Sequence, residues 1–204
     1  MNRAMGDENA RLRATMTCPP VHAVALVCHP DTRSDAVRGV RARVARSSDG
    51  TLAVRYALDA NLDRLRLPRP RTPRIAEGLW RHTCCELFVA RKGSPGYHEF
   101  NFGPSSEWAA YAFARYRDGH VLADEELNPA ITVRSTEGSL ELDARVRLDR
   151  LSPIHPTVRL SLAVSAVVED DSGVLSYWAL RHPPGKPDFH HPDAFAMEID
   201  EVRN

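Results

Sequence analysis

The sequence predicts an all-β fold, an antiparallel β-sandwich of the jelly-roll type. Short segments rich in aromatic and β-branched residues recur along the chain, and clusters of Gly, Pro, Ser, Asn and Asp separate them. Three of these breaks, Asp49-Gly50, Glu137-Gly138 and Ser172-Gly173, are typical of hairpin turns, because glycine accepts the positive φ angles of such turns. No stretch shows a helical period with capping residues, so we expect roughly ten or eleven short strands.

The positions of the strands in the sequence are predicted from the alternation of apolar and polar residues. The clearest case is 140–148, where apolar residues alternate with charged ones, the pattern of a half-buried strand. Prolines and charged residues mark three connecting stretches, 61–78, 115–129 and 181–193. We expect strands over residues 21–28, 37–46, 51–58, 84–91, 97–102, 108–113, 131–135, 140–148, 158–168, 174–180 and 195–200.

Length and composition indicate one domain. The chain has 204 residues, enough for one sizeable core. Residues 1–17 are polar and aperiodic and are expected to form a disordered extension, whereas residues 18–204 form a single sandwich domain. The formal net charge is zero, with 27 basic and 27 acidic residues, which argues against a nucleic-acid partner.

The lack of a recognisable targeting signal and the spacing of the cysteines predict a cytoplasmic protein. No run is apolar and long enough to span a membrane, and the N-terminus lacks the apolar segment of a secretory signal. The four cysteines match no zinc-binding spacing and are expected to be free thiols: Cys18, Cys28, Cys84 and Cys85. No metal site is expected.

The stretch 84–102 carries polar residues at unusual places for strands. Successive side chains of a strand point to opposite faces, and only one pairing register places the apolar side chains of both strands together. In that register Leu87 and Val89 lie beside Phe100 and Phe102. The opposite face then carries four polar side chains, namely Glu86, Tyr97, Glu99 and Asn101.

Two carboxyl groups on one sheet face admit several interpretations. If Glu86 and Glu99 are close and partly buried, one pKa rises or a cation lies between them. The two carboxyl groups therefore have three interpretations: they form a ligand site, they belong to a satisfied polar cluster, or they lie on a sheet face open to water. Paired carboxylates also suit glycoside hydrolysis, which makes an enzyme using both glutamates and a histidine the second hypothesis.

The loop 181–193 holds further titratable groups. If the loop folds back toward His82, these groups suit acid–base chemistry near neutral pH or metal binding. Otherwise they are solvated or capping residues. The groups are His182, Asp188, His190 and His191. Haem binding, the third hypothesis, requires an axial His or Met, and no pair here has a spacing that indicates ligation. No cofactor is therefore expected.

Several segments together resemble the DOMON-like proteins related to the family 9 carbohydrate-binding modules. The segments are Trp80-Arg81-His82, Cys85-Glu86-Leu87-Phe88, Tyr97-His98-Glu99-Phe100-Asn101-Phe102 with Pro104, Trp108 and Tyr111, Tyr177-Trp178-Ala179-Leu180, and Pro187-Asp188-Phe189-His190. The resemblance implies a β-sandwich that binds a sugar or, in other branches, haem. It also implies that aromatic rings clamp a glycan while charged side chains hold its hydroxyls.

The sequence therefore predicts a protein that binds a carbohydrate, or another polyhydroxylated or anionic small molecule, on a concave sheet face, without membrane or nucleic-acid partners. The predicted ligand-binding residues are Trp80, Arg81, His82, Glu86, Tyr97, Glu99, Asn101, Trp178, Asp188 and His190.

Overall fold

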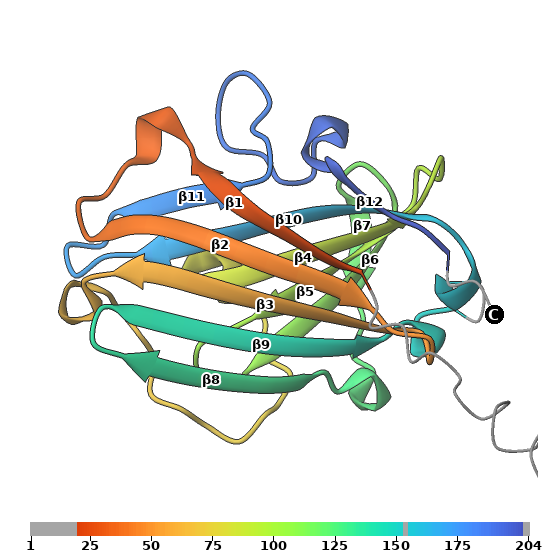
Figure 1. The fold of residues 1–204 in the computed structure, drawn as a ribbon, viewed down its shortest axis with the longest axis horizontal. Coiled ribbons are helices and arrows are strands. Elements are labelled where there is room, and N and C mark those ends of the chain that lie inside the picture. The colour runs from red at the N-terminus through yellow and green to blue at the C-terminus, as the bar shows by residue number, and fades with distance from the viewer. Residues whose placement is uncertain (1–19, 153–154, 202–204) are drawn as a thin grey trace, which may run out of the picture.

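The twelve strands of the described residues form two packed layers of antiparallel sheet (Figure 1). The structure is a computed structural model and describes residues 20–152 and 155–201. The layer that we call sheet A has the order β1-β2-β3-β9-β8. Its strands are β1 (Val21–Cys28), β2 (Val37–Arg46), β3 (Thr51–Ala60), β9 (Ser139–Arg147) and β8 (Ala130–Thr136).

The layer that we call sheet B has the order β11-β10-β4-β5-β6-β7. β1 connects the layers, because its last residues, Val27 and Cys28, pair with β11 while the rest of the strand pairs with β2. The strands of sheet B are β4 (Cys84–Arg91), β5 (Tyr97–Phe102), β6 (Trp108–Arg115), β7 (Asp118–Val121), β10 (Leu160–Glu169), β11 (Leu175–Ala179) and β12 (Met197–Ile199), the last pairing with the start of β10.

The helical elements of the described residues are single 3-10 turns in the connections between strands. None of the described helices has the length and apolar character needed to cross a membrane. The turns are η1 (Pro30–Thr32), η2 (Leu62–Arg64), η3 (Leu79–Arg81), η4 (Glu125–Leu127), η5 (Leu148–Arg150), η6 (His155–Thr157) and η7 (Pro192–Ala194).

The all-β sandwich and its three predicted hairpins are confirmed. The turns at Asp49-Gly50, Glu137-Gly138 and Ser172-Gly173 join β2 to β3, β8 to β9 and β10 to β11. The φ angle of Gly50 is +79°, the left-handed conformation for which glycine is needed in this turn. The ends of several strands differ from the predicted ones by one or two residues.

One strand was missed in the sequence. β7 lies inside the stretch 115–129, which was predicted to be a connection without a strand. Its four residues are mostly polar and exposed, so they lack the apolar alternation that indicates a strand. β7 pairs with β6, and in this pairing Gly119 lies opposite Phe113 and close to its ring.

Two earlier predictions concern residues outside the described ones. The expected disorder of residues 1–17 and the state of Cys18 both fall there. Within the described residues, Cys28, Cys84 and Cys85 are free thiols.

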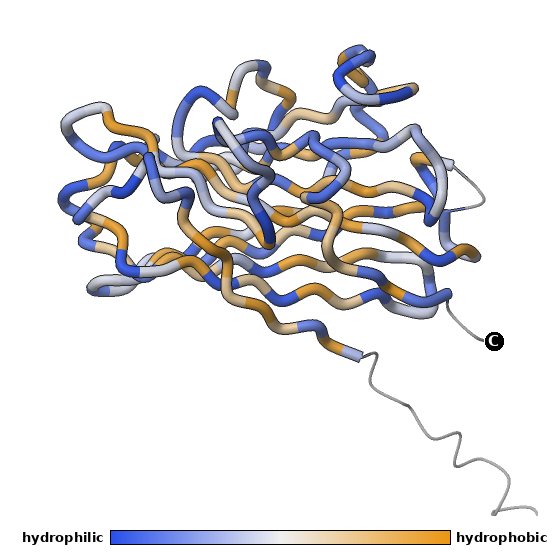
Figure 2. The backbone as a smooth tube through the Cα atoms, turned by 90° about the horizontal axis from the view of Figure 1, so that it is seen from above, coloured by the Kyte–Doolittle hydropathy of each residue, from blue (hydrophilic) through white to orange (hydrophobic). Residues whose placement is uncertain are grey.

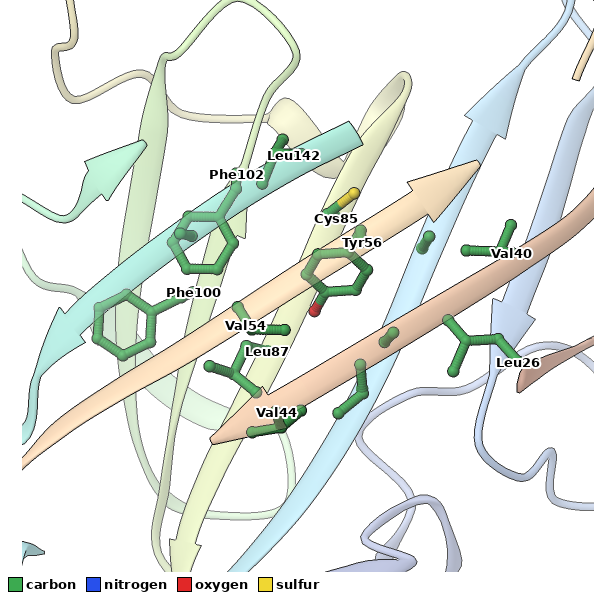
Figure 3. Packing of buried hydrophobic residues seen from close by; sticks show 14 of the residues in the cluster. Leu26, Val40, Val44, Val54, Tyr56, Cys85, Leu87, Phe100, Phe102 and Leu142 are labelled. Atoms are coloured by element: carbon green, nitrogen blue, oxygen red, sulfur yellow. The ribbon is translucent and has the colours of Figure 1, made fainter. Parts of the chain in front are cut away.

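The main core lies between the two sheets. Alternate side chains of each strand point into it, and Figure 2 shows the resulting alternation of hydrophobic and hydrophilic residues along the strands. Tyr56 from sheet A is fully buried among Val54, Leu87 and Cys85 (Figure 3). Its hydroxyl donates a hydrogen bond of 2.6 Å to the backbone carbonyl of Glu86, which fixes that part of β4 against sheet A.

Sheet B is also covered on its outer face. Seven of the eight residues of β4 are buried, whereas burial in β2 largely alternates with exposure. A second apolar cluster lies on the outer face, where Phe88, Tyr97 and Val167 pack against Phe189 and Ala194. The last two belong to the segment 181–196, part of the blue chain at the top of Figure 1. This segment therefore forms a cover over the outer face of sheet B.

Candidate functional site

The pairing of β4 with β5 places the four predicted polar residues on the outer face of sheet B. Glu86 pairs with Asn101, Phe88 with Glu99, and Ala90 with Tyr97. The inner face of the same pairing carries the predicted apolar side chains, since Leu87 pairs with Phe100. The predicted register is thereby confirmed, although whether these residues bind a ligand is a separate question.

A cavity of about 400 Å³ opens between the outer face of sheet B and the segment 181–196. Aromatic rings supply most of its apolar wall, and two carboxyl groups, an arginine and a histidine supply its polar part. The lining residues are Trp80, Glu86, Glu99, Tyr111, Phe113, Arg117, Val167, Tyr177, Pro187, Phe189 and His190.

Four of the predicted residues line this cavity, and three more support it. Trp80, Glu86, Glu99 and His190 line it directly. Tyr97, Asn101 and Asp188 hold the lining residues in place. The Asn101 amide donates a 2.9 Å hydrogen bond to Glu99 Oε1, and Asp188 Oδ1 accepts one of 2.8 Å from Arg117.

Arg81 and His82 lie beside a different cavity, of about 760 Å³. His82 Nδ1 is 2.6 Å from Glu169 Oε2, and His82 is not among the residues that line the first cavity. The guanidinium of Arg81 lies 5.0 Å from the ring centroid of Trp80, so it contacts the first cavity only through that ring.

Trp178 belongs to the core between the sheets. It pairs with Ala166, whose side chain is also in that core, and its indole N–H donates a 3.0 Å hydrogen bond to Ser176 Oγ. The neighbouring Tyr177 points to the opposite face and lines the cavity. The aromatic wall that the sequence assigned to Trp178 is thus supplied by Tyr177.

His190 is held in one orientation by Tyr97. The Tyr97 hydroxyl accepts a 3.1 Å hydrogen bond from the backbone N–H of Arg117 and lies 2.9 Å from His190 Nδ1. Since the hydroxyl has one proton to donate, we assign Nδ1 as its acceptor, which leaves the imidazole proton on Nε2. Nε2 faces Glu99 Oε2 at 3.7 Å.

Burial determines the charge state of the site. It raises the pKa of Glu99 to about 7, although the Asn101 hydrogen bond and the Arg117 charge act against this rise. Burial and the nearby Glu99 raise the pKa of Glu86 well above its usual range. Burial, assisted by the Arg117 charge, lowers the pKa of His190 to about 4. At neutral pH the imidazole is therefore neutral, and burial favours the protonated form of Glu86.

The Glu86 carboxyl has no partner within the described part of the chain. The residue is only 3% exposed, yet none of residues 20–152 and 155–201 gives its carboxyl a hydrogen bond or ion pair. Buried carboxyl groups are normally hydrogen-bonded, and one that faces a cavity without a partner is suited to receive a donor from a ligand.

Seven lining residues were not among the predicted site residues, and two of them, Pro187 and Phe189, lie in the segment 181–196. Tyr111 and Phe113 on β6 pair with Glu99 and Tyr97, so alternation in the stretch 108–113 places them on the site face. Arg117 had no comparable signal, because it lies in a turn with a φ of +55°. Val167 and Tyr177 face the cavity from the two strands on the other side of β4.

The described residues contain no group of three or more His, Cys, Asp or Glu side chains placed to hold a metal ion. The cavity lining offers aromatic rings, two carboxyl groups, a neutral imidazole and an arginine.

Comparison with solved structures identifies the fold. A candidate carbohydrate-binding protein from Bacteroides uniformis ATCC 8492 superposes with a TM-score of 0.65 at 15% identity, over 90% of this chain and 87% of that one. The chain has the fold of family 9 carbohydrate-binding modules. Such a module from Caldicellulosiruptor kristjanssonii, in complex with cellotriose, gives a TM-score of 0.57 at 12% identity, over 90% of this chain and 84% of the module.

A family 9 module from the same organism in complex with glucose gives a TM-score of 0.53 at 11% identity, over 84% of this chain and 80% of that chain. No family model matches the sequence, and no curated protein matches it. At these identities the likeness establishes the fold, and the ligand has to be argued from the cavity.

Proposed function

We propose that this protein binds a carbohydrate, or a related polyhydroxylated small molecule, in the cavity on the outer face of sheet B. The observation that carries the proposal is the buried, unpartnered carboxyl of Glu86 at a cavity with aromatic walls. Such a cavity offers apolar surface together with a few convergent polar groups, the usual character of a small-molecule site.

The cavity suits the two kinds of surface that a sugar presents. The faces of a pyranose ring carry C–H groups, which pack on aromatic rings such as those of Trp80 and Tyr177. Its edges carry hydroxyl groups, which donate to carboxyl oxygens and accept from N–H groups. Glu86 and Glu99 supply the acceptors, and His190 Nε2–H supplies a donor.

The structural neighbours support this proposal. Two of them are family 9 modules in complex with cellotriose and with glucose, and this chain shares their fold over most of its length. We propose that the residues in direct contact with the ligand are Trp80, Glu86, Glu99 and His190, positioned by Tyr97, Asn101 and Asp188.

A hydrolase is the second candidate, and the carboxyl pair favours it. Glu86 and Glu99 are diagonal neighbours across β4 and β5, a relation that corresponds to about 7–8 Å between backbone positions. The raised pKa of Glu86 suits a general acid, and Glu99 would act as the base or nucleophile. Release of nitrophenol from aryl glycosides tests this candidate, and its loss in Glu86→Gln would establish the role.

Haem binding, which the DOMON-like resemblance implies, fits these residues poorly. The axial ligands that the sequence suggested do not meet, because Met197 lies in the core and His82 contacts Glu169, while His190 lines the cavity. A Soret band in the absorbance spectrum of the purified protein would show that it binds haem.

Calorimetric titration with glucose, cellotriose and amino sugars tests the proposed function. Trp80 is 47% exposed at the cavity and carries stacking surface, so Trp80→Ala should weaken sugar binding roughly tenfold or more. Val174→Ala is the matched control, because Val174 is 46% exposed and does not line the cavity. Absence of binding for every neutral and amino sugar at millimolar concentration would contradict the proposal.

A further inference from the structure

The polar groups beneath the cavity are mostly acceptors of hydrogen bonds. Glu86 contributes a carboxyl without a partner, and Asn101, its neighbour across the strands, has a buried Oδ1 that no described residue contacts with a donor. Glu99 receives one hydrogen bond, from the Asn101 amide. A ligand that complements this surface must bring several donors close together.

The cations near the cavity are already engaged elsewhere. Arg117 donates to Asp188 Oδ1 at 2.8 Å and to the Tyr116 hydroxyl at 3.3 Å. His190 is neutral, with Nδ1 occupied by Tyr97. The Arg117 charge acts on Glu99 from a distance, but its ion pair is with Asp188.

Arg81 and His82, which precede β4 in the sequence, line the neighbouring cavity. His82 is paired with Glu169, which also holds Arg66 at 2.9 Å. Among the described residues, no arginine or lysine therefore forms an ion pair with Glu86 or Glu99.

The aromatic walls add a second preference. Trp80, Tyr111, Phe113, Tyr177 and Phe189 surround the same space. The faces of aromatic rings carry negative electrostatic potential and attract cations, most strongly where water is excluded. Rings and carboxyl groups around one cavity thus favour a cationic group over a neutral one.

We propose that the ligand carries a protonated amine, as in an amino sugar, and that this amine binds between Glu86 and Glu99. An ammonium group offers three donors and no acceptor, which matches the acceptor-rich surface. A hydroxyl group supplies a donor but no charge, so it leaves the two buried carboxyl groups unable to ionise together. This inference rests on the proposed function, because it names the ligand class of the same cavity.

Three trisaccharides with one β-1,4-linked backbone test the proposal by calorimetric titration of the full chain: the glucosamine trimer, its N-acetylated form and cellotriose. The glucosamine trimer is expected to bind at least about tenfold more tightly than the other two. In Glu86→Gln and in Glu99→Gln this preference should fall to about twofold or less.

The control is Glu198→Gln, a substitution of an exposed carboxylate on β12 that should leave the preference unchanged. Glutamine has nearly the same size and shape as glutamate, so it is a close substitute for Glu86. Circular dichroism checks the fold of each variant, and Glu99→Gln provides a second, independent variant. Equal binding of cellotriose and the glucosamine trimer would overturn the amine but leave carbohydrate binding standing. No binding of any trimer would overturn both, and a preference that persists in both glutamine variants would overturn the amine site.

Discussion

The Tyr97 hydroxyl lies 2.9 Å from Nδ1 of His190 and thereby joins β5 to the segment that covers the outer face of sheet B. The two residues are far apart in the sequence, and the contact places the imidazole at the cavity with Nε2 toward Glu99. The Tyr97 ring also stacks on Phe113, with centroids 4.7 Å apart, so one side chain organises both the polar and the apolar wall.

Tyr97→Phe should release His190 without removing any group that lines the cavity. The loss of the hydroxyl leaves Nδ1 without its donor and the Arg117 N–H without its acceptor, at a cost of about 1–3 kcal/mol in the free energy of unfolding. Nitrogen-15 NMR of the imidazole should show a mixture of tautomers in place of the Nε2–H form. An unchanged tautomer would mean that Tyr97 does not orient His190.

The buried carboxyl groups should make the protein less stable as the pH rises above neutral. In the folded protein the pKa of Glu99 is raised to about 7 and that of Glu86 is raised well above its usual range. The folded state therefore holds protons that the unfolded chain releases from about pH 4.5 upward, so these two groups lower the free energy of unfolding as the pH rises.

Histidines oppose this trend at lower pH. The pKa values of His190 and His155 are lowered to about 4, so the unfolded chain binds more protons at these residues between about pH 4 and 6.5, and stability rises with pH there. Above about pH 6.5 the carboxyl effect should lower the free energy of unfolding by roughly 1–3 kcal/mol up to pH 8. Urea unfolding across this range measures the decline, which should vanish when Glu86→Gln and Glu99→Gln are combined; its persistence would refute the assignment.

Tyr56→Phe should destabilise the fold by about 1 kcal/mol, because the hydrogen bond from its hydroxyl to the Glu86 carbonyl is fully buried between the sheets. Tyr177→Phe is the matched control, since no described residue forms a hydrogen bond with the Tyr177 hydroxyl. Chemical unfolding of both variants should show the loss for Tyr56 alone. Equal stability of the two variants would mean that the bond between the sheets contributes nothing.

Gly119→Ala should disturb Phe113, which belongs to the aromatic wall of the cavity. A Cβ at this position would lie 2.4 Å from Phe113 Cδ1 and 2.5 Å from the Ala112 carbonyl oxygen, so β7 or the Phe113 ring must move, at a cost of about 1–3 kcal/mol. Gly39→Ala, where a Cβ meets nothing within 4 Å, should be tolerated. Thermal unfolding compares the two, and equal melting temperatures would contradict the described packing of β7.

Alternation along β4 and β5 was sufficient to predict the polar face of the site. The apolar pairs of these strands have one sensible register, and that register fixes the partners of Glu86 and Glu99. The same reasoning could have extended to Tyr111 and Phe113, because β6 pairs directly with β5.

The remaining wall of the site could not be predicted in this way. Sheet B is buried on both faces near β10 and β11, so alternation does not show whether Trp178 or Tyr177 faces the core. The position of His190 depends on a loop without regular structure and on its contact with Tyr97. His82 was misplaced for a similar reason, since its partner Glu169 is 87 residues away in the sequence.

The indole N–H resonances of the three tryptophans provide the most direct test of the central claim that this cavity binds carbohydrate. Trp80 lines the cavity, whereas Trp108 and Trp178 are buried in the core between the sheets. Titration of nitrogen-15-labelled protein with the glucosamine trimer and with cellotriose should shift the Trp80 resonance and leave the other two nearly unchanged. Saturable binding that leaves Trp80 unshifted, or no binding of either sugar, would contradict the account.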